Sequence, residues 1–87
     1  MLVTIEFQDD FENIPQYTKV SLDPEYNDTI EDVKVLITLK YSGLDVTKMN
    51  VFYNGRKIRN TDRLSNIGAK EGALLIVRRH HSCCNLF

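Results

Sequence analysis

Hydrophobic and polar residues alternate near the start of the chain, which is the period-two pattern of a strand with one buried face. The pattern occurs over residues 2–7 and again over residues 18–23. The apolar positions of these two segments are Val3, Ile5, Phe7, Val20 and Leu22. Residues 8–17 between them are mostly polar and contain Pro15, so we expect a long hairpin loop. Pro24 should end the second strand, because proline has no backbone N–H for a ladder hydrogen bond.

A helical period follows this predicted hairpin. Thr29 and Asp32 have the spacing of a capping box, in which each side chain accepts a hydrogen bond from the backbone N–H of the other residue. Apolar residues then recur every three or four positions, which predicts one buried stripe on a helix. The members of the stripe are Ile30, Val33, Ile37 and Tyr41. Gly43 is the expected left-handed stop at the end of the helix.

The second half of the chain predicts two or three more strands. Residues 49–53 form a short strand, Asn54-Gly55 is a strong hairpin-turn signal, and residues 56–58 begin the return strand. The near-continuous apolar run over residues 74–77 suits a central position in a sheet. A short helical turn is expected before it, packed through Leu64 and Ile67. The order ββαββ predicts an α+β fold, a mixed four- to five-stranded sheet packed on one α-helix.

The length and the charge distribution limit the number of domains and the nature of the surface. The chain has 87 residues, enough for one domain, and no apolar run approaches the length of a membrane span. Residues 1–32 carry nine acidic side chains and only one basic side chain, whereas residues 33–87 carry ten basic and three acidic ones. This predicts one acidic and one basic side that orient partners, or else two ordinary solvated surfaces. The N-terminus lacks a signal-peptide pattern, so we expect the protein in the cytoplasm or nucleus.

Several short segments carry a family resemblance. Residues 28–34, DTIEDVK, nearly repeat the helix start of ubiquitin, and residues 1 to about 79 resemble a ubiquitin-like β-grasp domain. Residues 80–87 are expected to form a flexible C-terminal tail. Three further segments look like the N-terminal domain of Ddi-type (DNA-damage-inducible) proteins. They are MLVT at 1–4, SLDPEY at 21–26 and GAKEG at 68–72.

The resemblance implies a role in protein binding. Ddi-type proteins resemble proteasome shuttles that also carry a retroviral-type aspartic protease domain, but this chain contains no Asp-Thr-Gly or Asp-Ser-Gly motif. It is therefore expected to be a non-catalytic interaction module and not an enzyme. The implied partners are ubiquitin, ubiquitin-interacting helices or proteasome receptor subunits. Arg56, Lys57, Arg59 and Arg63 match no nucleic-acid-binding motif and the net charge is negative, so no nucleic acid is expected.

Ubiquitin-like domains usually bind partners through an apolar patch on the exposed side of the sheet. The resemblance places the central patch position at Phe52. If Val51, Tyr53, Leu74 and Ile76 face the helix, alternation places the neighbouring patch residues on the opposite face. The predicted apolar patch is Phe52, Leu75 and Val77, with a basic rim of Arg56, Arg78 and Lys48. The alternative is that a loop, the tail or a dimer partner covers these residues.

The last residues raise three further possibilities. There is no Gly-Gly end, which argues against covalent conjugation as a modifier. Cys84-Asn85-Leu86-Phe87 fits a loose prenylation box, and Cys83 is a candidate for palmitate, although Asn85 is not aliphatic. The alternative function is therefore a lipid-anchored ubiquitin-fold protein that recruits partners to a membrane; otherwise the segment is a linker. The His80, His81, Cys83 and Cys84 spacing is too tight for a metal site, and no cofactor is expected.

Two apolar residues of the first loop have no assigned role. Phe11 and Ile14 lie among acidic residues in residues 8–17. Either they extend the apolar patch or they fold down over hydrophobic surface. The sequence leaves both alternatives open.

Overall fold

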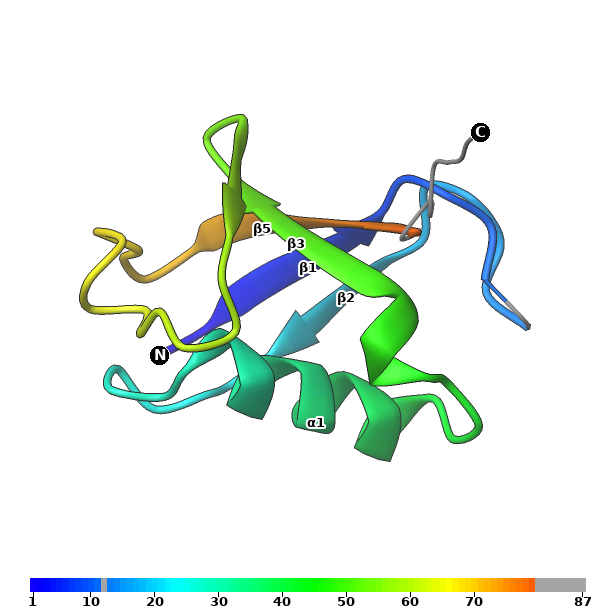
Figure 1. Ribbon diagram of the computed structural model, residues 1–87, viewed down its shortest axis with the longest axis horizontal. Coiled ribbons are helices and arrows are strands. Elements are labelled where there is room, and N and C mark those ends of the chain that lie inside the picture. Colours follow the sequence, from blue (N-terminus) through cyan, green and yellow to red (C-terminus); the bar gives the residue numbers. More distant parts are fainter. Residues whose placement is uncertain (12, 80–87) are drawn as a thin grey trace, which may run out of the picture.

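The computed structural model describes residues 1–11 and 13–79. One helix packs against a mixed five-stranded sheet (Figure 1). The elements are β1 (Val3–Phe7), β2 (Lys19–Leu22), α1 (Ile30–Lys40), the 3-10 turn η1 (Val46–Lys48), β3 (Met49–Tyr53), β4 (Arg56–Ile58) and β5 (Ala73–Arg79). The strand order is β2-β1-β5-β3-β4, with β1 and β5 parallel and the other pairs antiparallel. The predicted α+β β-grasp arrangement is confirmed.

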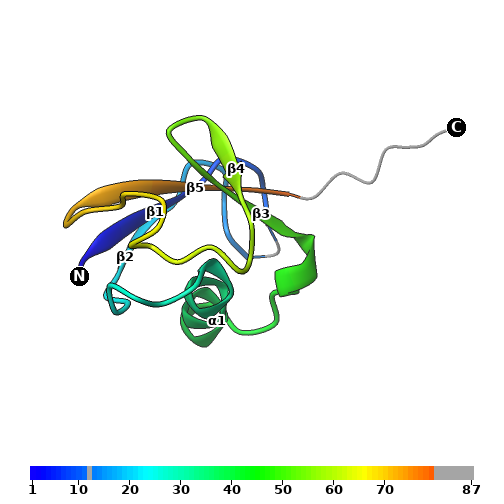
Figure 2. The ribbon, with the colours of Figure 1, turned by 60° about the vertical axis from the view of Figure 1, so that its left-hand side comes forward.

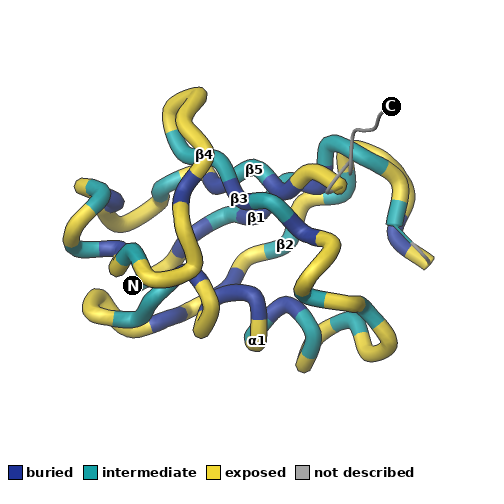
Figure 3. Tube along the Cα trace, viewed as in Figure 1, coloured by how far each residue is buried: buried dark blue, intermediate teal, exposed yellow. Residues whose placement is uncertain are grey.

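The core lies between the sheet and α1. The β1 residues Val3, Ile5 and Phe7 are buried and alternate with half-buried polar residues, as their period-two pattern predicts. Buried positions recur along the strands and on α1 (Figure 3). β5 occupies the centre of the sheet, hydrogen-bonded to β1 on one side and β3 on the other. Its inward-facing residues, Leu75 and Val77, are fully buried in this core.

The capping box starts α1 as predicted. The Thr29 hydroxyl accepts a hydrogen bond from the backbone N–H of Asp32 at 3.2 Å, and the Asp32 carboxylate accepts from the backbone N–H of Thr29 at 3.1 Å. These two bonds satisfy donors that the first turn of a helix otherwise leaves without a partner. Ile30, Val33 and Ile37 are buried, as the predicted stripe requires.

The cap can be tested directly. We expect Thr29→Ala to lower the free energy of unfolding by about 1 kcal/mol, because the Asp32 amide loses its acceptor. Thr29→Ser keeps a hydroxyl in the same place and is the matched control. Urea denaturation followed by circular dichroism measures both variants. An alanine variant as stable as the serine variant would show that the cap contributes nothing.

The β3–β4 hairpin also forms as the sequence indicates. Asn54 and Gly55 both have positive φ angles, +54° and +80°, which is the conformation of a type I′ turn. Tyr53 pairs with Arg56 across this turn, and this fixes Phe52 opposite Lys57. The hairpin register therefore determines which residues accompany Phe52 on its face of the sheet.

Candidate protein-binding surface

The face of the sheet opposite α1 carries an apolar strip. Figure 2 shows α1 on one side of the sheet, with no helix of the described residues covering the other side. Phe52 on β3 lies directly opposite Ile76 on β5, and both are half-buried. Leu74, two residues before Ile76, is 44% exposed, and Leu2 is 51% exposed. We call this set, Phe52, Ile76, Leu74 and Leu2, the outer strip.

The prediction for β5 was wrong about which side chains face outward. Leu75 and Val77, predicted to be exposed, are both fully buried. Leu74 and Ile76, predicted to face the helix, lie on the opposite face from them. The register shows why, because Leu75 lies beside Ile5 and Val77 beside Phe7, two residues of the core. A one-residue shift in phase moves every side chain of a strand to the other face.

The rim around the outer strip differs in part from the predicted one. Arg78 is exposed at the next outward position after Ile76, and with Phe52, Asn50 and Arg79 it lines a hollow of about 310 Å³. Sequence reasoning missed Lys57, which is exposed and lies opposite Phe52. The hairpin-turn signal at Asn54-Gly55 fixes this pairing and would have identified it.

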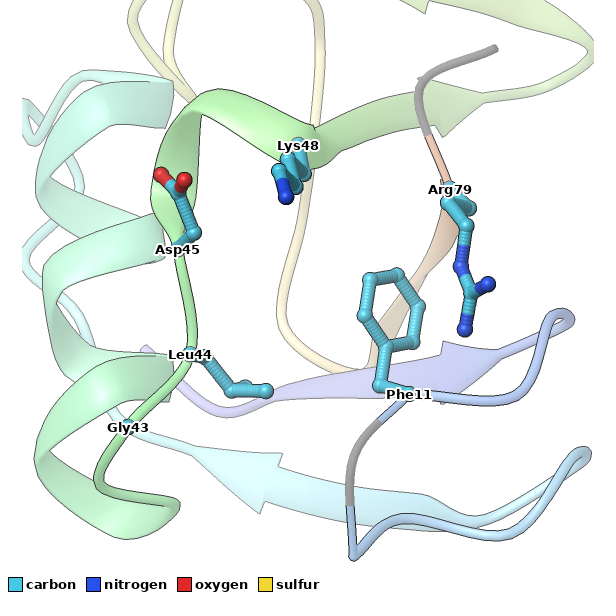
Figure 4. A pocket seen from close by; sticks show the side chains of 6 residues that line it. All are labelled: Phe11, Gly43, Leu44, Asp45, Lys48 and Arg79. Carbon is cyan, nitrogen blue, oxygen red and sulfur yellow. The ribbon is translucent and has the colours of Figure 1, made fainter.

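The other two predicted rim residues lie apart from the centre of the outer strip. Arg56 pairs with Tyr53 at the hairpin turn, in the opposite phase to Phe52. Lys48 lines a separate hollow with Phe11, Leu44 and Arg79 (Figure 4). The cations nearest to the outer strip are therefore Arg78 and Lys57.

The first loop covers hydrophobic core, which decides between the two alternatives for its apolar residues. Ile14 is buried, and the Phe11 ring packs edge-on against Phe7 with ring centroids 5.6 Å apart. The Arg79 guanidinium lies 5.7 Å from the centre of the Phe11 ring, and Figure 4 shows the two side chains next to each other. The backbone N–H of Arg79 also donates to the Asp9 carboxylate at 2.7 Å, and its guanidinium donates to the Asp10 carbonyl. Phe11 and Ile14 thus belong to the packed loop.

Lys34 on α1 is a buried cation. It is only 6% exposed, and its Nζ donates to the Asn60 side-chain oxygen at 2.6 Å. Asn60 is neutral, and no carboxylate among residues 1–11 and 13–79 forms an ion pair with Lys34. Burial, followed by repulsion from Lys57, lowers the pKa of Lys34 below its usual 10.5, whereas Glu31 opposes this shift. The charged form of Lys34 therefore destabilises the fold.

Replacement of this lysine should stabilise the protein. Because the pKa of Lys34 is lower in the folded state, the unfolded chain binds more protons between that lowered pKa and 10.5, and stability rises with pH across this window. We expect Lys34→Met to raise the free energy of unfolding near pH 7 by on the order of 1 kcal/mol. The advantage over wild type should shrink near pH 10, where Lys34 discharges more easily.

Urea denaturation of wild type and Lys34→Met at the two pH values measures this difference. Lys70→Met, at an exposed position in the loop before β5, is the control, and we expect it to change stability little at either pH. A Lys34→Met variant less stable than wild type near pH 7 would contradict a net penalty from the buried charge.

The described residues give no support for metal chemistry. No group of three or more histidine, cysteine, aspartate or glutamate side chains within residues 1–11 and 13–79 is arranged to hold a metal ion. The described part of the chain also contains no helix long and apolar enough to cross a membrane. The tail residues His80, His81, Cys83 and Cys84 lie outside the described residues. Lipidation of Cys83 or Cys84 accordingly stays a prediction.

The arrangement of one capped helix on a five-stranded mixed sheet defines a ubiquitin-like β-grasp domain. The chain is similar to the Arabidopsis thaliana protein DNA-DAMAGE INDUCIBLE 1, with 33% identity over 58 residues. This match covers 67% of the present chain and 14% of the plant protein. No model of a known protein family matches the chain. The similarity confirms the resemblance to Ddi-type proteins predicted from the sequence.

Proposed function

We propose that this chain is a non-catalytic protein-interaction module that links a Ddi-type shuttle protein to ubiquitin or to the proteasome. The observation that carries the proposal is the outer strip, an apolar surface on the face of the sheet opposite α1. Contiguous exposed apolar surface next to charged residues is typical of protein-binding sites. The similarity to a Ddi-type protein supports the choice of partner class. Such a module would act in the cytoplasm or nucleus.

The chemistry of the outer strip favours an amphipathic partner helix with acidic residues beside its apolar face. Phe52 and Ile76, paired across β3 and β5, supply adjacent apolar contacts for such a helix. Lys57 lies opposite Phe52 on β4, and Arg78 is the next outward residue after Ile76 on β5; both are exposed. Their positive charge complements acidic side chains and fixes the orientation of the partner more than it adds to affinity.

Calorimetric titration tests the proposal. The protein is titrated separately with ubiquitin, with a synthetic ubiquitin-interacting helix and with purified proteasome receptor subunits. We expect saturable binding to at least one of them, weakened by salt because exposed rim charges contribute. Absence of binding to all three would overturn the proposed link to the ubiquitin–proteasome system.

A further inference from the structure

A third hollow lies at the edge of the sheet where β4 ends. It is about 360 Å³ in volume. Its apolar side chains are Val46, Met49 and Ile58, and its polar and charged lining residues are Lys34, Thr47, Asn50, Lys57, Arg59 and Asn60. Three of these residues are cations and none is acidic. The composition of the hollow therefore favours an anion.

Lys34 provides the strongest argument for a ligand here. A lysine ammonium group has three N–H donors, and one of them is used by Asn60. The residue is buried with no ion-pair partner among the described residues, an arrangement that normally destabilises a fold. An anion in the hollow would supply the missing negative charge and accept the remaining hydrogen bonds.

The other cations extend the site toward solvent. Lys57 is exposed, and its charge acts on Lys34, since repulsion between them contributes to the lowered pKa of Lys34. Arg59 is also exposed and makes a long contact of 3.9 Å from its Nε to the Asp62 carboxylate, so its charge is partly compensated. Lys34 and Lys57 are thus the two cations of the hollow that lack an ion-pair partner among the described residues.

We propose that this hollow binds a phosphate group, held by Lys34 and Lys57 with Asn60 beside them. A phosphate carries close to two negative charges and matches two lysines that form no ion pair among the described residues, whereas a carboxylate carries one. The group belongs either to free inorganic phosphate or to a phosphorylated side chain of a bound protein. Lys57 makes the second source accessible, because it lies opposite Phe52 and joins the hollow to the outer strip.

Amide NMR titrations with inorganic phosphate and with O-phosphoserine test this site, at constant ionic strength maintained with sodium chloride. We expect saturable shifts of the Asn50, Ile58 and Asn60 amides. Lys57→Met should weaken binding about tenfold or more, since a hydrogen bond to a charged group is lost. Lys34→Met should have the same effect, and Lys70→Met, outside the hollow, should have none.

The two probes distinguish the sources of the phosphate. Tighter binding of O-phosphoserine assigns the hollow to a phosphorylated side chain, whereas tighter binding of inorganic phosphate assigns it to the free ion. Shifts that do not saturate with either probe would overturn the proposal. An equal loss of affinity in Lys57→Met and Lys70→Met would also overturn it. No protein partner takes part in the titration, so its outcome is independent of the proposed role of the outer strip.

Discussion

Leu75→Ala should lower the free energy of unfolding by about 3 kcal/mol, a value within the range for a leucine removed from a packed core. Leu75 is fully buried on the central strand β5, beside Ile5 of β1. The alanine leaves a cavity that a strand hydrogen-bonded on both sides cannot close by moving. Urea denaturation followed by circular dichroism measures the loss. Leu75→Val removes less volume, so its loss in free energy of unfolding can be measured even if the alanine variant does not fold.

The adjacent residue supplies a matched control. Leu74 is the same residue type on the same strand, but it is 44% exposed on the outer face. We expect Leu74→Ala to lower the free energy of unfolding by less than about 1 kcal/mol, because much of the side chain is already in contact with water. Equal losses for the two variants, or a larger loss for Leu74→Ala, would contradict the assigned phase of β5.

Phe52→Ala should weaken binding of the partner by at least about 1 kcal/mol, which is about fivefold in Kd. Large aromatic side chains near the centre of an interface contribute more to affinity than the residues around them. Phe52 is half-buried and lies opposite Ile76, so we expect Ile76→Ala to weaken binding as well. Calorimetric titration of each variant with the partner bound by wild type measures the change.

The control for Phe52→Ala is a residue on α1, on the other side of the sheet. Leu39 on α1 is 76% exposed and does not belong to the outer strip. Leu39→Ala should leave affinity unchanged. If Phe52→Ala binds every wild-type partner with unaltered affinity while Leu39→Ala binds more weakly, the binding surface is on the helix and the proposed site is wrong.

Local signals predicted most of the fold. The capping box at Thr29 and Asp32, the Asn54-Gly55 turn and the alternation of β1 each involve residues close together in the chain. In each case the physical cause, a cap, a left-handed turn or a two-residue period, acts within a few positions. Such features form as the sequence indicates, provided that the tertiary contacts agree with them.

The candidate site depends on contacts between distant segments, and the sequence predicted less of it. Residues 73–77, ALLIV, contain no polar residue to mark the outer face, so the parallel register with β1 sets the phase of β5. Lys34 is buried partly because Asn60, 26 residues later, provides its hydrogen-bond acceptor. Phe11 packs on Phe7 and beneath Arg79, near the far end of the described chain. The spacing of apolar and polar residues within one segment does not predict these contacts.

The most direct test of the outer strip as the binding surface is an amide NMR map of the protein with its bound partner. We expect the largest shifts at Phe52, Leu74 and Ile76 and at their immediate neighbours on β3 and β5. Residues on the exposed side of α1, such as Val35 and Leu39, should shift little. If the largest shifts occur on α1 and the outer strip does not shift, the partner binds the helix and the outer strip is not the binding surface.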